Sequence, residues 1–302
     1  MRQESPRSTR ESQKYSGESQ PIPGKSPQLP KEYLEQLTRR RYSSNTIKTY
    51  TCYFMDFLLY FEDRDLKSIS SAQIKNYLLE LIQYKKISVS QQNQRINAIK
   101  FYYEKVLNRK KTVYYIERPK REKKLPVVLS RDEVKAILGK TTNLKHKCIL
   151  MTLYSAGLRR SELIKLEIGD IDSERMLIRI RNSKGNKDRY SLLSGKLLVM
   201  LREYYRIYHP NRWLFEGPRG NPYSATSIEN IFRRALKKSG IQKKATPHTL
   251  RHSFATHLLE QGINLRYIQE LLGHASITTT EIYTRVSSHK LSQIKNPLDG
   301  LY

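Results

Sequence analysis

Apolar side chains recur at helical spacing through the first third of the chain. Between residues 29 and 108 they return every three or four positions, as at Ile47, Tyr50, Phe54 and Phe57, which is the repeat of one helix face. Three of these stretches follow polar residues suited to helix starts, namely Asn45, Ser71 and Ser90. The pattern predicts a small domain of four helices.

From about residue 126 the pattern is mixed. Ser130 and Glu133 have capping-box spacing before an apolar stripe. Gly157 follows a strongly apolar stretch and is suited to end a helix. Helices are predicted near residues 148–154, 197–205 and 227–238.

Residues 176–180 and 190–193 have strand character. The segment between them is polar and contains Gly185 followed by Asn186, which is typical of a hairpin turn. The sequence therefore predicts a mainly α (α+β) chain whose second domain carries a small antiparallel sheet.

Composition divides the chain further. Residues 1–28 are rich in Ser, Pro, Gln, Arg and Glu and hold too little apolar bulk for a core, so a disordered tail is expected there. Residues 109–125 are basic, contain one proline and show no helical stripe. We expect a helical domain over 29–108, a basic linker over 109–125 and a second domain over 126–302.

The charge balance indicates a polyanionic partner. The chain holds 56 Lys and Arg against 28 Asp and Glu, for a formal net charge of +28, and such an excess attracts nucleic acid. The alternatives are a membrane surface and ordinary solvated helix faces. The candidate DNA-binding residues are Arg39, Arg40, Arg41, Lys48, Arg95, Lys100, Lys120, Arg121, Lys123 and Lys124.

The cysteines and the length of the apolar runs indicate the cellular compartment of the protein. Cys52 and Cys148 both fall within apolar helical patterns, so both are expected in cores and not in a disulfide or zinc site. The chain has no apolar run of about 18 residues, the length that a membrane helix needs. These features predict a protein of the reducing cytoplasm.

The stretch from Thr246 to Thr284 holds the densest candidate chemistry. Thr246 and Pro247 suit the start of a helix, and His248 and Arg251 then lie on one face at its positive end, a setting that attracts phosphate. Zinc is an alternative, because His248 and His252 are four residues apart. Position 249 is Thr where the metalloprotease motif has Glu, which disfavours zinc.

Four short motifs together resemble those of the tyrosine recombinases, the phage-integrase and Xer family. They are AGLRRSEL at residues 156–163, SKGNKDR at 183–189, HTLR at 248–251, and LGH at 272–274 with TEIY at 280–283. They occur in the family's order. The resemblance spans about residues 30–300 and implies a SAM-like core-binding domain followed by a catalytic domain of the tyrosine-recombinase fold.

The resemblance implies a metal-free and cofactor-free cleavage of DNA. Tyr283 is the expected nucleophile, which would form a covalent 3′-phosphotyrosyl bond, with nearby cations favouring its anion. Arg159 and Arg251 would bind the phosphate, and Lys184 would protonate the leaving 5′ oxygen. His248 would assist as an acid–base group, and His274 would support the phosphate.

Several assignments have alternatives. Arg160 stands beside Arg159, and the family usually has an apolar residue there. Lys187 is an alternative to Lys184. Glu162 either orients Arg159 or only stabilises a helix. His252 and His257 are expected to pack or cap, and a capping box from Thr278 to Glu281 is expected before the nucleophile.

The family further implies duplex DNA as partner, bound by a clamp at a specific core site. A homotetramer would exchange strands through a Holliday junction, with an accessory DNA-bending protein or a partner recombinase as a further participant. The tail after Val286 would dock on a neighbouring protomer or on its own domain. The resemblance implies a prokaryotic, nucleoid-associated enzyme for integration, excision or Xer-type resolution. A type IB topoisomerase-like relaxer and a non-catalytic DNA-binding protein of this fold are the alternatives.

Overall fold

The computed structural model describes residues 28–109, 118–119, 125–181 and 188–284. The chain divides into two compact units, Met1–Glu122 and Lys123–Tyr302, each of which is described by itself. The expected disordered tail lies outside the described residues except for its last position, and so does most of the expected linker.

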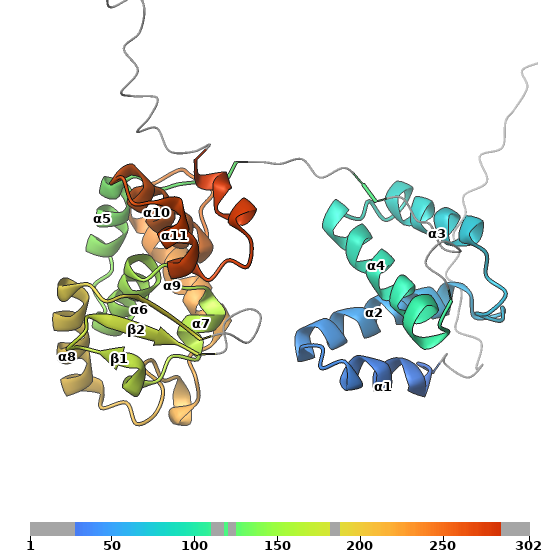
Figure 1. The fold of residues 1–302 in the computed structure, drawn as a ribbon, viewed down its shortest axis with the longest axis horizontal. Coiled ribbons are helices and arrows are strands. Elements are labelled where there is room, and N and C mark those ends of the chain that lie inside the picture. The colour runs from blue at the N-terminus through green and yellow to red at the C-terminus, as the bar shows by residue number, and fades with distance from the viewer. Residues whose placement is uncertain (1–27, 110–117, 120–124, 182–187, 285–302) are drawn as a thin grey trace, which may run out of the picture. The chain divides into compact units, whose positions relative to one another are not determined.

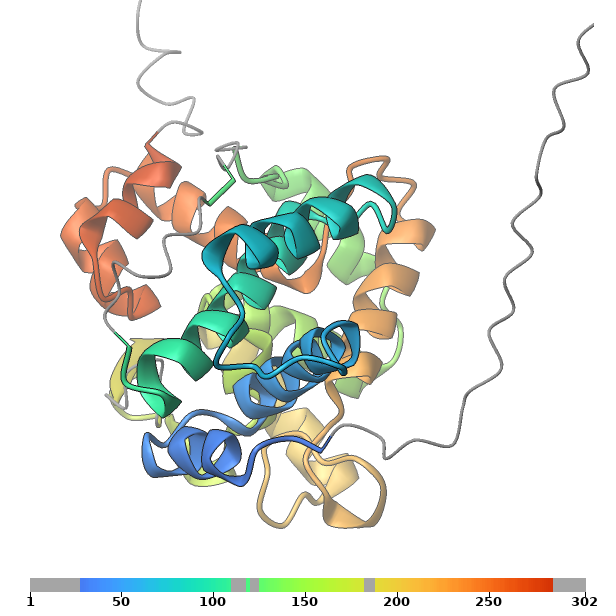
Figure 2. The same cartoon turned by 90° about the vertical axis from the view of Figure 1, so that its right-hand side faces the viewer.

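The first unit is helical in its described residues. Its helices are α1 (Lys31–Arg39), α2 (Ser44–Tyr60), α3 (Ser71–Gln83) and α4 (Val89–Phe101), and α4 runs into a π-helical turn at Tyr102–Val106. Figures 1 and 2 both show α2 and α4 side by side. The predicted domain of four helices is therefore present.

Aromatic rings fill the core of this unit. Tyr33 stacks on Phe54 with ring centroids 4.4 Å apart, and its hydroxyl donates to the carbonyl of Ala98 at 3.0 Å. Phe57 is also fully buried, as is Ile96 from α4. A buried tyrosine is stable here because its one polar group is hydrogen-bonded.

The expected helix starts are wrong by one or two residues. The hydroxyls of Ser43, Ser70 and Ser88 accept the capping hydrogen bonds of α2, α3 and α4, in place of Asn45, Ser71 and Ser90. In α3 and α4 the side-chain oxygen of a glutamine at the third helical position accepts a hydrogen bond from the backbone N–H of the capping serine. Several neighbouring serines can cap a helix, and this reciprocal bond favours one of them.

Two residues of this unit differ from the prediction. Cys52 is exposed, so it is not a core residue, whereas Cys148 in the second unit is buried. Arg95 is only 8% exposed and does not lie on an outer basic face. Its guanidinium contacts Asp56 at 2.7 Å, donates to the Tyr77 hydroxyl at 3.2 Å and lies over the Tyr53 ring.

In the second unit a small sheet packs against helices on one side (Figure 1). Its strands are β1 (Ile171–Asp172), β2 (Leu177–Ile180) and β3 (Arg189–Leu192), paired antiparallel in the order β1-β2-β3. Its helices are α5 (Arg131–Gly139), α6 (Leu144–Ser155), α7 (Arg160–Ile164), α8 (Gly195–Tyr208), α9 (Ala225–Lys238), α10 (Pro247–Glu260) and α11 (Leu265–Leu272). The predicted α+β class with a β2–β3 hairpin is confirmed, while the hairpin tip lies outside the described residues.

Two apolar clusters hold this unit together. The larger one contains α6 residues such as Cys148 and Leu153, and Ile178 and Ile180 from the sheet. The capping box of Ser130 and Glu133 starts α5 as predicted. The smaller cluster is formed by Phe254, Ala255, Ile268, Leu272 and Tyr283, so the expected nucleophile belongs to a packed core between α10 and α11.

In the portion of the chain that the structure describes, no helix has the length and apolar character required to cross a bilayer.

Candidate active site

Helix α10 begins as the sequence predicts and presents two candidate groups. Pro247 is its first residue, and the backbone N–H of Thr246 donates to the Thr249 hydroxyl at 3.0 Å. His248 is exposed at this end of the helix, whereas Arg251, one turn on, is only 1% exposed. The two residues share a face but differ in their access to solvent.

Arg251 ties α10 to two loops. Its Nη1 donates to the carbonyl of Gly157 at 2.7 Å, and its Nη2 donates to the carbonyl of Leu272 at 2.6 Å. The Nε group is buried and has no partner among the described residues. Burial and Arg159 lower the pKa of Arg251 to about 9, so the guanidinium stays charged at neutral pH and keeps a donor for an anion.

Gly157 is required for this arrangement. It has a positive φ of 58°, and a Cβ at this position would lie 2.4 Å from the Phe254 ring. Only glycine adopts this conformation without strain and leaves room for the ring. The glycine of the AGLRRSEL motif therefore places the carbonyl that Arg251 binds.

The structure distinguishes the two neighbouring arginines. Arg159 Nη1 donates to Glu162 Oε1 at 2.7 Å, and its Nη2 donates to the carbonyl of Gly273 at 3.4 Å. Arg160 instead pairs with Glu229 at 3.0 Å on the exposed surface. Arg159 therefore lies with Arg251 and the end of α11, and Arg160 has a separate carboxylate partner.

Glu162 is the buried anion that joins these cations. Its carboxylate accepts from the Arg159 backbone N–H at 2.7 Å and from Arg189 Nη1 and Nη2 at 2.8 and 2.9 Å, and it lies 3.6 Å from Arg251 Nη1. Burial would raise its pKa, but the hydrogen bonds and charges of Arg189, with Arg159 and Arg251, lower it to about 2. Glu162 thus orients Arg159 in addition to starting α7.

Arg189 was not singled out from the sequence. Its side chain is 8% exposed, and its Nε donates to the carbonyl of Leu271 at 2.9 Å. It lies opposite Ile180, and Ser191 lies opposite Ile178, on the core face of the hairpin. Counting back from the buried Leu193 in steps of two places Arg189 on the core face, and this spacing is the sequence signal for its burial. The apolar Tyr190 and Leu192 suggest that the other face is buried, but both are exposed.

Tyr283 lies in a 3-10 turn, Glu281–Tyr283, and is 1% exposed. Its hydroxyl lies 3.1 Å from His252 Nδ1. Burial raises the pKa of Tyr283, and the charges of Arg251 and Arg159 oppose this without reversing it. The two arginines therefore favour the anion, as expected, but in this state loss of hydration outweighs their attraction and the net shift of the pKa is upward.

His274 follows the left-handed Gly273 that ends α11. Its Nδ1 lies 2.9 Å from the Thr280 hydroxyl, which is buried. Burial, followed by Arg251 and Arg159, lowers the pKa of His274 to about 3, so the ring is neutral. If Thr280 donates to Nδ1, the other ring nitrogen carries the hydrogen and can donate to phosphate.

The expected capping box from Thr278 to Glu281 does not form. The hydroxyl of Ser276 instead accepts from the Thr278 backbone at 3.3 Å, and two separate 3-10 turns, Ile277–Thr279 and Glu281–Tyr283, lead to the nucleophile. The two short turns place the Thr280 hydroxyl next to His274.

A surface hollow of about 410 Å³ adjoins these groups. Arg159 and His248 line it together with the exposed Arg160, and its other lining residues are Ser161, Glu229, Thr246 and Pro247. A cationic hollow at a helix N-terminus suits a phosphate. Of the described residues, no three His, Cys, Asp or Glu side chains are grouped to hold a metal.

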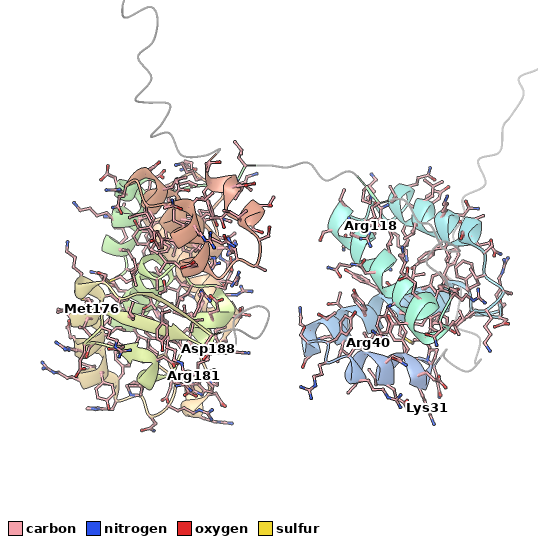
Figure 3. All side chains as sticks on the ribbon, viewed as in Figure 1. Lys31, Arg40, Arg118, Met176, Arg181 and Asp188 are labelled. Carbon is pink, nitrogen blue, oxygen red and sulfur yellow. The ribbon has the colours of Figure 1, made fainter. Side chains whose placement is uncertain are left out.

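Lys184 and its alternative Lys187 lie outside the described residues. Arg181 and Asp188 are the described residues on either side of that segment, and Figure 3 labels both at one end of the sheet. Asp188 pairs with Arg179 at 2.9 Å. The described residues that flank this segment in the sequence therefore lie at the strand ends where Ile180 pairs with Arg189.

The expected DNA-binding residues have different environments. Arg39, Arg40, Arg41 and Lys48 are exposed at the end of α1 and the start of α2 (Figure 3 labels Arg40). Lys100 is partly buried and pairs with Glu104 at 3.3 Å. The remaining basic candidates lie outside the described residues, namely Lys120, Arg121, Lys123 and Lys124.

Models of two families match the chain. The Phage integrase family matches residues 127–290, and the Phage integrase, N-terminal SAM-like domain matches residues 29–112. The chain is 38% identical over 273 residues to tyrosine recombinase XerA of Pyrococcus horikoshii, with 87% of this chain and 90% of the relative covered. It is 34% identical to an integrase/recombinase of Escherichia coli, with 89% and 93% covered.

Solved structures show the same likeness. A crystal structure of XerA recombinase is 33% identical, with 88% of this chain and 98% of that chain covered and a TM-score of 0.52. XerH recombinase bound to a palindromic difH substrate is 24% identical, with 86% and 82% covered and a TM-score of 0.69. At this identity, the likeness to XerH shows a shared fold.

Proposed function

Because the chain belongs to the phage integrase family and is thus a tyrosine recombinase, an enzyme of site-specific DNA recombination, we propose that Tyr283 is its nucleophile. Tyr283 attacks a phosphodiester of duplex DNA and forms a 3′-phosphotyrosyl bond. This bond conserves the energy of the broken linkage, so a 5′ hydroxyl can rejoin the strand without a cofactor. Residues 29–108 form the DNA-binding domain and residues 126–302 the catalytic domain.

The remaining groups have separate roles in this proposal. Arg159 and Arg251 bind the non-bridging oxygens, since guanidinium groups suit phosphate and stabilise its growing charge in the transition state. His248 donates from the rim of the hollow, and His274 supports the phosphate from the end of α11. Lys184 supplies the proton to the leaving 5′ oxygen.

One observation carries the proposal. Arg251 binds the carbonyls of Gly157 and Leu272, so motifs more than 100 residues apart in the sequence meet at one guanidinium. Tyr283 packs in the same cluster as Leu272. A tyrosine that was merely structural would not require a buried, charged arginine with a spare donor at its side.

The assembly is inferred from proteins of the same fold. Structures with the same fold include XerH bound to difH substrate and a lambda integrase tetramer bound to a Holliday junction. For this chain we infer a homotetramer on paired core sites, acting in the cytoplasm of a prokaryote, with an accessory DNA-bending protein or partner recombinase where the site requires one. Integration, excision and dimer resolution all use this chemistry.

Covalent trapping tests the nucleophile. Duplexes from the DNA that flanks the gene, nicked close to the cleavage position, lose the short 5′ product and cannot be rejoined. Wild-type protein should form a DNA adduct that survives detergent, and Tyr283→Phe should form none. Tyr154→Phe is the matched control, because Tyr154 also bonds a histidine of α10. An adduct that persists in Tyr283→Phe would refute the assignment.

A further inference from the structure

His252 is the hydrogen-bond partner of the nucleophile. Among the described residues, only its Nδ1 lies within hydrogen-bond distance of the Tyr283 hydroxyl, at 3.1 Å. Its ring also packs edge-on against His248, with centroids 4.5 Å apart. His252 follows Arg251 directly on α10, and a helix holds it more rigidly than a loop would.

The chemistry of the two groups sets the direction of the bond. Burial raises the pKa of Tyr283, so the phenol keeps its proton. Burial, with smaller contributions from His248 and Arg251, lowers the pKa of His252 to about 4, so the imidazole is neutral. A protonated phenol is a better donor than a neutral imidazole, hence Tyr283 donates, Nδ1 accepts, and the hydrogen of His252 sits on Nε2.

His248 is in a different position. It is exposed and lines the hollow with Arg159, and in the described part of the chain it makes no hydrogen bond to Tyr283. Its ring is therefore directed to the phosphate side of the site. The hydrogen bond that an acid–base partner of the tyrosine requires, expected from the sequence for His248, is made in this state by the histidine one turn further along α10.

We propose that His252 is a further catalytic residue, which orients the Tyr283 hydroxyl and takes its proton during cleavage. As the bond from Oη to phosphorus forms, the Oη–H bond breaks and the proton moves to Nδ1. The bond from phosphorus to the 5′ oxygen breaks, and that oxygen takes the proton of Lys184. Religation reverses both transfers. The inference rests on the proposed role of Tyr283.

The neutral state of His252 fits this role. Before DNA binds, an imidazolium beside Arg251 and His248 would be repelled, so the acceptor stays free. A phosphate anion in the hollow would offset the charges of Arg159 and Arg251 and thereby raise the basicity of the ring. Proton transfer from Tyr283 to His252 is then favoured when the substrate is in place, because the positive charge of the imidazolium develops close to the bound phosphate anion.

Two substitutions separate orientation from proton transfer. His252→Asn keeps an oxygen acceptor near the position of Nδ1 but cannot take a proton, and His252→Ala removes both functions. We expect single-turnover adduct formation to slow by roughly 100-fold or more in Ala, with Asn between Ala and wild type. His257→Asn is the matched control, because its Nδ1 bonds Tyr154 at 2.9 Å on the same helix. It should stay within about threefold of wild type.

A modified substrate identifies the side of the reaction. With sulfur in place of the bridging 5′ oxygen, the leaving group needs no acid, so Lys184→Ala should recover most of its rate. The His252 variants should not recover, because their defect lies at the nucleophile. Melting temperature and DNA binding close to wild type for the Asn variant would show that folding is intact.

The outcomes divide clearly. An unchanged rate in His252→Ala and His252→Asn, or recovery of both on the sulfur substrate, would overturn the role of His252 while leaving Tyr283 as nucleophile. No adduct with wild-type protein on either substrate would overturn the proposed function and the inference with it. A slow Ala variant, a partly active Asn variant and no recovery by sulfur would establish the role.

Discussion

Glu162 offers the sharpest test of how the site is held together. Glu162→Gln changes the charge of one buried group and almost nothing of its volume. The carboxylate accepts hydrogen bonds from Arg159 and Arg189 and lies 3.6 Å from Arg251. A glutamine amide has one acceptor oxygen and presents an N–H₂ group to guanidinium donors, so at least one of these bonds is lost.

The magnitude follows from the environment of the carboxylate. Its pKa falls from 4.5 to about 2, and this preference for the ionised form corresponds to about 3 kcal/mol. Removing one partner of a buried ion pair typically costs about 3–5 kcal/mol, because the other charge is left uncompensated. Both routes predict that Glu162→Gln lowers the free energy of unfolding by about 3 kcal/mol at pH 7.

Urea unfolding at several pH values measures the effect. The native pKa is lower than the unfolded one, so the contribution of Glu162 is complete above about pH 4.5 and is lost as the pH falls toward 2. The difference between wild type and Glu162→Gln should therefore be constant from pH 7 to 5 and narrow below 4.5. Glu229→Gln is the control, since its pair with Arg160 is exposed and worth less than about 1 kcal/mol.

Two results would contradict this reasoning. A loss in Glu162→Gln no larger than that in Glu229→Gln would show that the carboxylate does not stabilise the buried arginines. A difference that stays constant down to pH 2 would show that the loss arises from packing and not from charge.

Three further changes have defined outcomes. Gly157→Ala should lower the melting temperature and slow adduct formation, because its Cβ would meet the Phe254 ring at 2.4 Å; normal values for both would contradict the close packing. Arg159→Ala should reduce adduct formation at least about 100-fold while Arg160→Ala stays within about tenfold, and gel assays on nicked DNA would reveal the reverse order. Arg95→Ala should destabilise the protein to urea by about 1–3 kcal/mol, because the buried Tyr77 loses its partner, without changing the salt dependence of DNA binding, whereas a shallower salt slope would indicate a phosphate contact.

The local structure of the motifs could be predicted from the sequence, because it depends on residues close together in the chain. Thr246 and Pro247 start α10 through capping and fixed φ, and Gly157 provides a left-handed turn. These features depend on neighbouring residues alone. The strand character of residues 176–180 and 190–193, with the Gly185–Asn186 turn signal between them, likewise predicted β2 and β3, because strand pairing across a turn is local.

The connections among the motifs are not local and could not be predicted. The bonds from Arg189 to Glu162 and from Arg251 to Leu272 depend on how distant segments pack. Arg95 illustrates the same point, because its charge suggested a DNA-facing surface and the neighbouring Asp56 and Tyr77 could not be foreseen. Burial of Tyr283 also reversed the expected direction of its pKa shift, since periodicity does not reveal how completely a 3-10 turn is covered.

Mapping the covalent adduct shows which side chain attacks the DNA. Wild-type protein trapped on nicked duplex DNA would be digested with trypsin and nuclease, and the modified peptide identified by mass spectrometry. We expect a nucleotide joined through its 3′ phosphate to Tyr283 and to none of the other 20 tyrosines among the 21 in the chain. A 3′-phosphonucleotide on another tyrosine, or a linkage through a 5′ phosphate, would contradict it.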